Sequence, residues 1–223
     1  MRMNKMITGA FLLFFAVSCH PRKSSAIGGD DQVIVFADSS EWNACETSFR
    51  GVLERVVRTP QPETDFTIQR EPISVFNSYR KYKYIVLLGL MDSKSEVSQT
   101  VHNLLTADAE KAVRSGDYFY FTKKNELAEG QTVILLLSEN SFTMNQALRR
   151  RGDEIFRIFD AHKTKLVSDF LYGSAPADTN FGNEFFQKYG WHMQMLPDYK
   201  RVETKADYVR WHSGAASSHR WIS

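Results

Sequence analysis

Hydrophobic periodicity along the chain predicts strands and helices that follow one another. Gln32–Ala37 (QVIVFA) is a continuous apolar run, typical of a strand covered on both faces. Asp38–Glu41 (DSSE) then offers an oxygen-bearing side chain with an acid three residues later, which is capping chemistry at a helix start. Apolar positions then recur at helical spacing: Trp42, Cys45, Phe49, Val52, Leu53 and Val56. Thr59–Glu63 contains two prolines, cannot continue a helix, and is expected to be a connector.

Three more strands and one helix complete a first unit. The strands are expected at Phe66–Glu71, Tyr82–Leu90 and Tyr118–Thr122. A second capping box, Ser93–Glu96, opens the helix, and Gly116 closes it. Residues 32–125 therefore have the order β-α-β-β-α-β, which predicts a ferredoxin-like unit with an antiparallel sheet and two helices on one face.

The second half of the chain resembles the first and predicts an internal duplication. The paired segments are Val33–Phe36 with Val133–Leu136, Phe66–Pro72 with Trp191–Pro197, and Tyr84–Val86 with Tyr208–Arg210. We therefore expect an α+β fold of tandem ferredoxin-like units, the second over residues 131–223 with an enlarged helical segment. Only twelve residues follow Trp211. The second unit is thus expected to be truncated, either by loss of its last elements or because the sequence is a fragment.

Residues 1–18 have the composition of an export signal. Arg2 and Lys5 precede the apolar run Met6–Val17, which is shorter than the ~20 residues that a spanning helix needs. Small residues then lead to Cys19, as in the lipobox of bacterial lipoproteins, where the cysteine is acylated and becomes the first residue. We expect a cleaved signal and lipid on Cys19; the alternatives are a secretory signal with a chance cysteine, or an uncleaved anchor.

The residues after the lipobox set the expected location. Residues 19–31 are polar and glycine-rich, which predicts a flexible tether. His20, rather than an aspartate, indicates the outer membrane by the sorting rule of enteric bacteria. We therefore expect a cell-envelope protein, held on the outer membrane by its lipid and facing the periplasm.

Charge and cysteine content exclude some partners and sites. Removal of Arg2 and Lys5 with the signal reduces the 28 basic residues to 26, which balance the 26 acidic ones. Overall charge therefore gives no support to a nucleic-acid partner. The basic cluster Arg149–Arg151 precedes two acids and is interpreted as a solvated helix face. Once Cys19 is acylated only Cys45 remains, so no intrachain disulfide can form.

Several of these segments together resemble a family of bacterial lipoproteins that carry a domain of unknown function, family 4837. They are the lipobox, VIVFADSSEW at residues 33–42, Pro60–Glu63, Lys188–Tyr199 and Asp207–Trp211. The chain departs from the family pattern at Thr59 and in the arginine-rich helix. The resemblance implies an envelope lipoprotein and supplies no activity, cofactor or catalytic residue.

Few residues are candidates for chemistry. Cys45 shares a helical face with large apolar residues, which favours a structural role over a nucleophilic one. His192 and His212 would point to one polar face if strands 191–196 and 207–212 formed a hairpin, and with His219 could hold zinc. A solvated sheet face is the ordinary explanation, so these histidines are weak metal candidates. The loop Pro60, Gln61, Pro62 and Glu63 could bind a partner, or it could simply link two elements.

Two functions remain open. The first is a non-catalytic, lipid-tethered module, without cofactor, that binds an envelope protein or glycan. The second is an envelope hydrolase or metal-dependent enzyme using His192 and His212. The chain has no nucleophile-elbow, Walker, dinucleotide-binding or metalloprotease motif, which favours the first.

Overall fold

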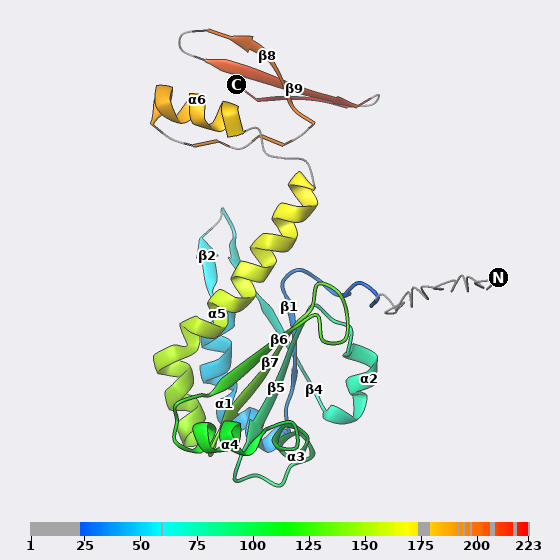
Figure 1. The fold of residues 1–223 in the computed structure, drawn as a ribbon, viewed down its shortest axis with the longest axis vertical. Coiled ribbons are helices and arrows are strands. Elements are labelled where there is room, and N and C mark those ends of the chain that lie inside the picture. Colours follow the sequence, from blue (N-terminus) through cyan, green and yellow to red (C-terminus); the bar gives the residue numbers. More distant parts are fainter. Residues whose placement is uncertain are drawn as a thin grey trace, which may run out of the picture.

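A computed structural model describes residues 23–58, 60–173, 179–190, 192–193, 195–196, 198–205, 208–215 and 218–222. The strands are β1 Gln32–Phe36, β2 Val56–Arg58, β3 Pro62–Thr64, β4 Thr67–Glu71, β5 Tyr84–Leu90, β6 Tyr120–Lys124, β7 Thr132–Ser138, β8 Lys200–Thr204, β9 Val209–Ala215 and β10 Ser218–Ile222. The helices are α1 Ser39–Leu53, the 3₁₀ helix η1 Ile73–Val75, α2 Phe76–Tyr79, α3 Glu96–His102, α4 Ala107–Arg114, α5 Ser141–Tyr172 and α6 Thr179–Tyr189. The chain therefore mixes helices and strands, as expected (Figure 1).

A five-stranded sheet in the order β4-β1-β5-β7-β6 forms the centre of the larger part of the molecule. The first four of these strands are parallel, and β6 alone runs antiparallel, against β7. Residues of β5 and β7 are buried throughout, which is typical of parallel strands covered on both faces.

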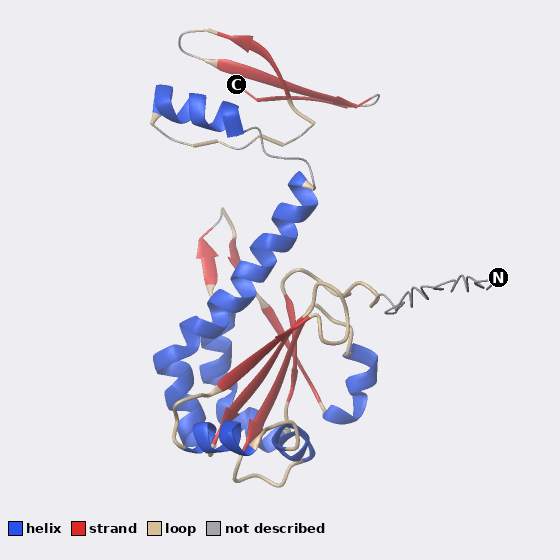
Figure 2. Cartoon of the chain, viewed as in Figure 1, coloured by secondary structure: helices blue, strands red, loops and turns tan. Residues whose placement is uncertain are grey.

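Helices cover both faces of this sheet and create two apolar cores (Figure 2). One core lies under α1 and α5; its members include Val33, Val35, Trp42, Cys45, Phe49, Tyr84, Val86, Ile134, Leu148, Ile155 and Phe159. The other lies under η1, α2, α3 and α4; its members include Ile34, Phe36, Ile85, Leu87, Val97, Val101, Val113, Leu135 and Leu137. Alternate residues of each strand thus face different helix layers, so the architecture is a three-layer sandwich.

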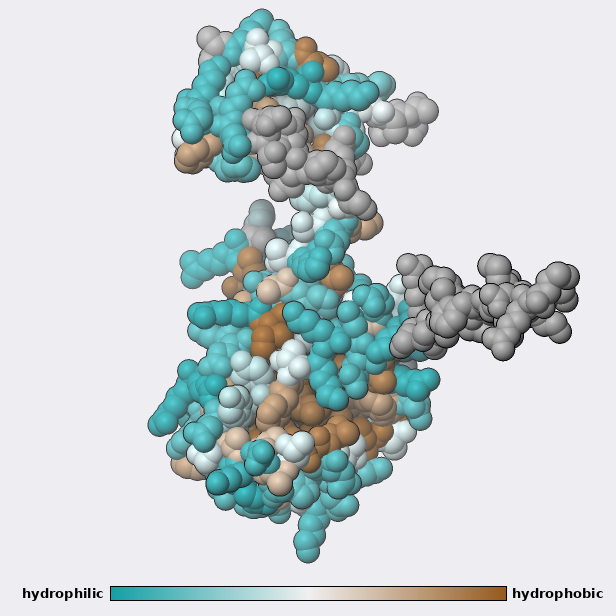
Figure 3. All heavy atoms as spheres, in the orientation of Figure 1, coloured by the Kyte–Doolittle hydropathy of each residue, from teal (hydrophilic) through white to brown (hydrophobic). Residues whose placement is uncertain are grey.

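The two faces are covered to different extents. The second core is covered by short helices, and several residues at its margin are only partly buried, among them Ile73, Tyr79 and Phe121. In Figure 3 the largest apolar area lies over this lower part of the molecule, whereas hydrophilic residues dominate the C-terminal part at the top.

The expected tandem ferredoxin-like units are not what the structure contains. A ferredoxin-like unit has an antiparallel sheet, whereas β1, β4, β5 and β7 are parallel. The expected boundary between units, at residues 125–131, is the turn between β6 and β7, which pair in one sheet. The physical reason lies in the apolar pattern of the strands. Helices on only one face of an antiparallel sheet would leave the other face in water, so apolar and polar residues would alternate along each strand. Continuous apolar runs instead indicate a parallel sheet that helices cover on both faces.

Local signals explain where the elements begin. Asp38 caps α1 by accepting a hydrogen bond from the backbone amide of Ser40 at 2.9 Å. The single helix expected between Ser93 and Gly116 is two helices, α3 and α4. Each has its own hydroxyl cap, Ser95 for α3 and Thr106 for α4. Gly116 follows α4 with a φ of 80°, a left-handed conformation that suits glycine at a helix end.

The C-terminal part is a separate small assembly beyond the end of α5 (Figure 1). β8, β9 and β10 form an antiparallel sheet, and α6 packs on it through Phe181, Phe185, Val209 and Trp211. The expected strand at residues 191–196 is wrong, because the described residues 192–193 and 195–196 have no regular structure. Trp191, Gln194 and Pro197 lie outside the described residues.

The expected flexible tether, residues 19–31, is ordered where the structure describes it. Ser25 forms a parallel bridge with Glu129, and Ile27 forms one with Tyr82. Residues 1–22, which include the expected signal peptide and Cys19, lie outside the described residues. Within the described part of the chain, no helix combines the length and apolar character needed to span a bilayer.

Candidate functional site

The principal candidate site is a groove between α1 and α5, the two long helices on one face of the sheet. Thr47, Ser48, Gly51, Val52, Arg55, Leu148, Arg149, Arg150, Gly152 and Asp153 line a cavity of about 380 Å³. Gly152 of α5 sits against Val52 of α1 so closely that a Cβ at this position would lie nearer than 3.0 Å to a methyl carbon. The absence of a side chain at Gly152 therefore lets the two helices meet at the floor of the groove.

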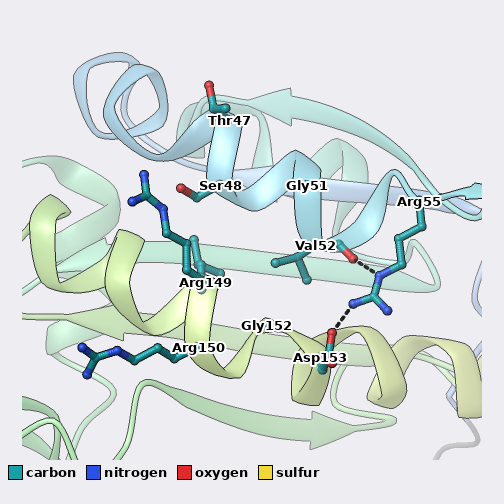
Figure 4. A pocket seen from close by; sticks show the side chains of 10 residues that line it. Thr47, Ser48, Gly51, Val52, Arg55, Arg149, Arg150, Gly152 and Asp153 are labelled. Atoms are coloured by element: carbon teal, nitrogen blue, oxygen red, sulfur yellow. Dashed lines mark hydrogen bonds and ion pairs between the residues drawn. The ribbon is translucent and has the colours of Figure 1, made fainter.

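Three arginines give the groove its charge. Arg55 donates to the carbonyl of Val52 at 2.9 Å and forms an ion pair with Asp153 at 2.6 Å (Figure 4). Arg149 and Arg150 are exposed, and their side chains have no hydrogen bond or ion pair with any described residue. In Figure 4 the Arg149 side chain extends toward Ser48, and Arg150 extends from the other side of α5.

This arrangement can bind an anionic group. Asp153, the acid that lines the groove, is already paired with Arg55, so Arg149 has no competing partner there. Guanidinium groups bind carboxylates and phosphates through parallel hydrogen bonds, and the hydroxyls of Thr47 and Ser48 can add further ones. The groove therefore combines guanidinium and hydroxyl donors that suit an anion.

A larger cavity, of about 520 Å³, lies further along α5, between residues 162–169 of that helix and the turn between β6 and β7. Lys83, Lys124, Lys165 and His162 are among its lining residues. Burial, followed by the charges of the lysines at 124, 165 and 83, lowers the pKa of His162. Asp30 pairs with Lys83 and Asp169 pairs with Lys165, so carboxylates already offset much of this positive charge.

A buried carboxylate lies near the ends of β1 and β5, the neighbouring strands that lead into α1 on one face of the sheet and α3 on the other. Glu41, in the first turn of α1, is only 4 % exposed. Its Oε1 accepts hydrogen bonds from the hydroxyls of Ser95 at 2.7 Å and Ser98 at 2.8 Å. Ser98 in turn accepts from the backbone amide of Leu90 at 2.8 Å. The start of α1, the start of α3 and the end of β5 are thus held by one hydrogen-bond network.

Comparison with known proteins assigns the three-layer part to a family. A family model described as a domain of unknown function (DUF8532) matches residues 26–170. The chain belongs to this family. The match covers the whole five-stranded sheet and α5 up to residue 170. It corrects the resemblance to family 4837, since DUF8532 is a different domain of unknown function. No curated protein and no solved structure matches the chain.

Cys45 lies on the buried face of α1, in the core of the DUF8532 domain. Burial, with a smaller contribution from the charge of Glu41, raises the pKa of its thiol to about 11. A reactive thiol needs the opposite conditions, so the geometry supports a structural role.

The Pro60–Glu63 loop is part of a hairpin. β2 and β3 pair antiparallel, and the register places Arg58 opposite Pro62 and Val57 opposite Glu63. These strand residues are exposed and do not line the α1–α5 groove. The segment is therefore a short projecting hairpin where an irregular connector was expected; its proposed role in binding a partner stays a prediction.

The histidine candidates lie in the C-terminal assembly. His212 stacks on His219, with its Nε2 2.8 Å from Nδ1 of His219, and also packs against Trp221. His192 lies instead against Gly182 of α6, because the expected hairpin that would have placed it beside His212 does not form. The described residues hold no group of three His, Cys, Asp or Glu side chains able to bind a metal ion. Cys19, the expected lipid attachment site, lies outside the described residues.

The groove was missed by sequence reasoning. Its two walls are about one hundred residues apart in the chain, and hydrophobic periodicity does not tell which helices pack together. Arg149–Arg151 was the available signal. Arg149 and Arg150 are exposed on α5, as expected of a solvated helix face, whereas Arg151 is half-buried and pairs with Glu154 at 2.8 Å. The sequence did not show that Arg149 and Arg150 border a groove.

Proposed function

We propose that this protein is a lipid-anchored envelope protein whose DUF8532 domain is a non-catalytic binding module. The anchor is proposed from the sequence pattern of residues 1–19, in which a signal-like run ends at Cys19. In this proposal the lipid holds the domain on the outer membrane, facing the periplasm, and the domain binds an envelope protein or glycan.

The unpaired Arg149 in the α1–α5 groove carries the binding part of the proposal. A surface arginine usually gains an acid partner or remains on an open helix face, whereas Arg149 borders a cavity beside hydroxyl groups. A cavity of about 380 Å³ is within the range that small ligands or a few side chains occupy. The partner is therefore proposed to present a carboxylate or phosphate to this groove.

Photo-crosslinking in intact cells tests this role. A photoreactive residue replaces Thr47, which is exposed and lines the groove. We expect a discrete adduct that Arg149→Glu weakens by about 10-fold to 100-fold, since a hydrogen bond to a charged group contributes about 1.5–3 kcal/mol. Arg157→Glu is the matched control, because Arg157 lies exposed on the same helix and does not line the groove.

Two results would contradict the binding role of the groove. One is an adduct that survives Arg149→Glu as well as it survives Arg157→Glu. The other is no adduct from position 47 although the protein is folded and on the membrane. The alternative of an enzyme using His192 and His212 has no specific observation in its favour, since these residues contact different neighbours.

A further inference from the structure

The first described residues of the chain are bound to one particular face of the domain. The backbone amide of Ala26 donates to Glu129 at 2.7 Å, and that of Ile27 donates to Lys81 at 2.9 Å. The ammonium of Lys23 donates to the carbonyls of Asn125 and Glu126, each at 2.7 Å. The N-terminal segment is therefore held against the β6–β7 turn and the turn before β5.

The chain between Cys19 and this attachment is short. Lys23 is four residues after Cys19, and four extended residues span at most about 14 Å. Lipid on Cys19 would therefore keep the backbone of Lys23 within that distance of the bilayer's polar surface, and the β6–β7 turn no more than one lysine side chain further away. A freely jointed tether over residues 19–31 would have imposed no such limit.

The same face has an excess of positive charge. We define the anchor face as residues 23–31, 80–83 and 123–131. These stretches contain six basic residues, Lys23, Arg80, Lys81, Lys83, Lys123 and Lys124, and four acidic ones, Asp30, Asp31, Glu126 and Glu129, which leaves a net charge of +2. Two of the basic residues are paired within the face, Lys83 with Asp30 and Lys123 with Glu126. Basic residues beside a membrane anchor are attracted to anionic lipid headgroups.

We infer that the anchor face lies against the headgroups of the bilayer, which fixes the orientation of the domain on the membrane. This inference rests on the proposed lipid at Cys19. Its basis is the ordered segment from Lys23 to Ile27 together with the charge of the surface to which that segment is bound.

This orientation determines what is accessible from the periplasm. Ser25 and Ala26 border the same cavity as His162, Lys165 and Asp169 of α5. The α1–α5 groove is lined by residues 148–150, 152 and 153 of that helix, at least nine positions before His162 and so about 14 Å or more along the helix axis from this contact. The groove therefore lies away from the anchor face. The cavity lined by Lys124 and His162 borders the anchor face, because Asn125, Glu129 and Gln131 also line it.

Energy transfer on vesicles tests the orientation with the full, lipidated protein. The vesicles contain phosphatidylethanolamine, phosphatidylglycerol and an acceptor on the lipid headgroup. A fluorescent donor is attached to Glu126→Cys in the anchor face, or to Asn103→Cys after α3; both positions are exposed. Cys45 is buried and does not compete for the label. The same labelled positions in Cys19→Ala protein supply the transfer that occurs without an anchor.

Residues 126 and 103 lie at opposite ends of the sheet, so donors at the two positions should differ in their distance from the bilayer. A seven-residue strand such as β5 spans about 23 Å, and we expect transfer from position 126 to exceed transfer from position 103 by at least about twofold. Equal transfer, or greater transfer from position 103, in protein whose intact mass includes acyl chains would overturn the orientation alone. An intact mass without acyl chains would overturn the anchor and the orientation together.

Discussion

The crossing of α1 and α5 can be tested by replacing one glycine. Gly152 is buried in the middle of α5, and a Cβ added there would lie nearer than 3.0 Å to Cγ2 of Val52 and 3.3 Å from Cγ1. Val52 is β-branched and has one strongly preferred rotamer in a helix, so it cannot rotate away at low cost. Gly152→Ala must therefore push the helices apart or force Val52 off its rotamer.

The expected loss of stability follows from two opposing terms. Replacing glycine by alanine inside a helix lowers the free energy of the folded state by about 0.5–1 kcal/mol. Overpacking at a close contact costs about 1–3 kcal/mol, so we expect Gly152→Ala to reduce the free energy of unfolding by about 1–2 kcal/mol. Gly51→Ala is the matched control. It is the same substitution on the other wall of the groove, where a Cβ would meet nothing within 4 Å, so it should stabilise by about 0.5–1 kcal/mol.

Urea unfolding measures both variants. With a slope near 2 kcal/mol per molar urea, the two unfolding midpoints should differ by about 1 M. Val52→Ala alone should cost about 2 kcal/mol for lost burial. In the Gly152→Ala background it should cost less than half as much, because the nearest remaining atom, Cβ of residue 52, is 3.4 Å away. Equal stabilisation by Gly51→Ala and Gly152→Ala, with additive effects of Val52→Ala, would refute the close helix crossing.

Three further predictions concern buried polar groups. Glu41→Ala removes the acceptor of two serine hydroxyls and should lower the free energy of unfolding in urea by about 1–3 kcal/mol, with Glu41→Gln less costly; an unchanged midpoint for both would contradict the network. The Cys45 thiol, with a pKa of about 11, should resist a thiol reagent at pH 8 until urea unfolds the protein, and rapid labelling of the native protein would contradict its burial. Burial lowers the pKa of the His162 imidazole in the folded protein, so the unfolded state binds more protons near pH 6. The free energy of unfolding should therefore fall as the pH is lowered from the pKa of His162 in the unfolded chain through its lower pKa in the folded protein. His162→Gln should flatten that part of the pH–stability curve; an identical slope in the variant would show that the imidazole is not the source.

The sequence predicted the elements of the central sheet better than their arrangement. The apolar runs at Gln32–Ala37 and Tyr82–Leu90 are strands, and Asp38 caps the expected helix. The resemblance of residues 33–36 and 133–136 reflects similar positions in the fold, since β1 and β7 both lie inside the sheet and each leads into a helix on the same face. Strand direction depends on which strands pair, which local periodicity does not specify.

The candidate site was less predictable than the fold. The groove forms because Gly152 packs closely against Val52. A glycine inside a helical pattern does not indicate which residue of another helix it will contact. The histidines were placed on one sheet face by assuming that residues 191–196 form a strand. Alternation, and the resemblance to the strand at 66–71, suggested that strand, whereas β9 pairs with β8 and β10.

Intact-mass measurement of the mature protein, taken from the membrane fraction, tests the central claim most directly. The account predicts a chain that begins at Cys19 and has the mass of acyl chains added to it, and a Cys19→Ala variant that leaves the membrane fraction. A mature chain without acyl mass that is recovered in the soluble fraction would contradict it.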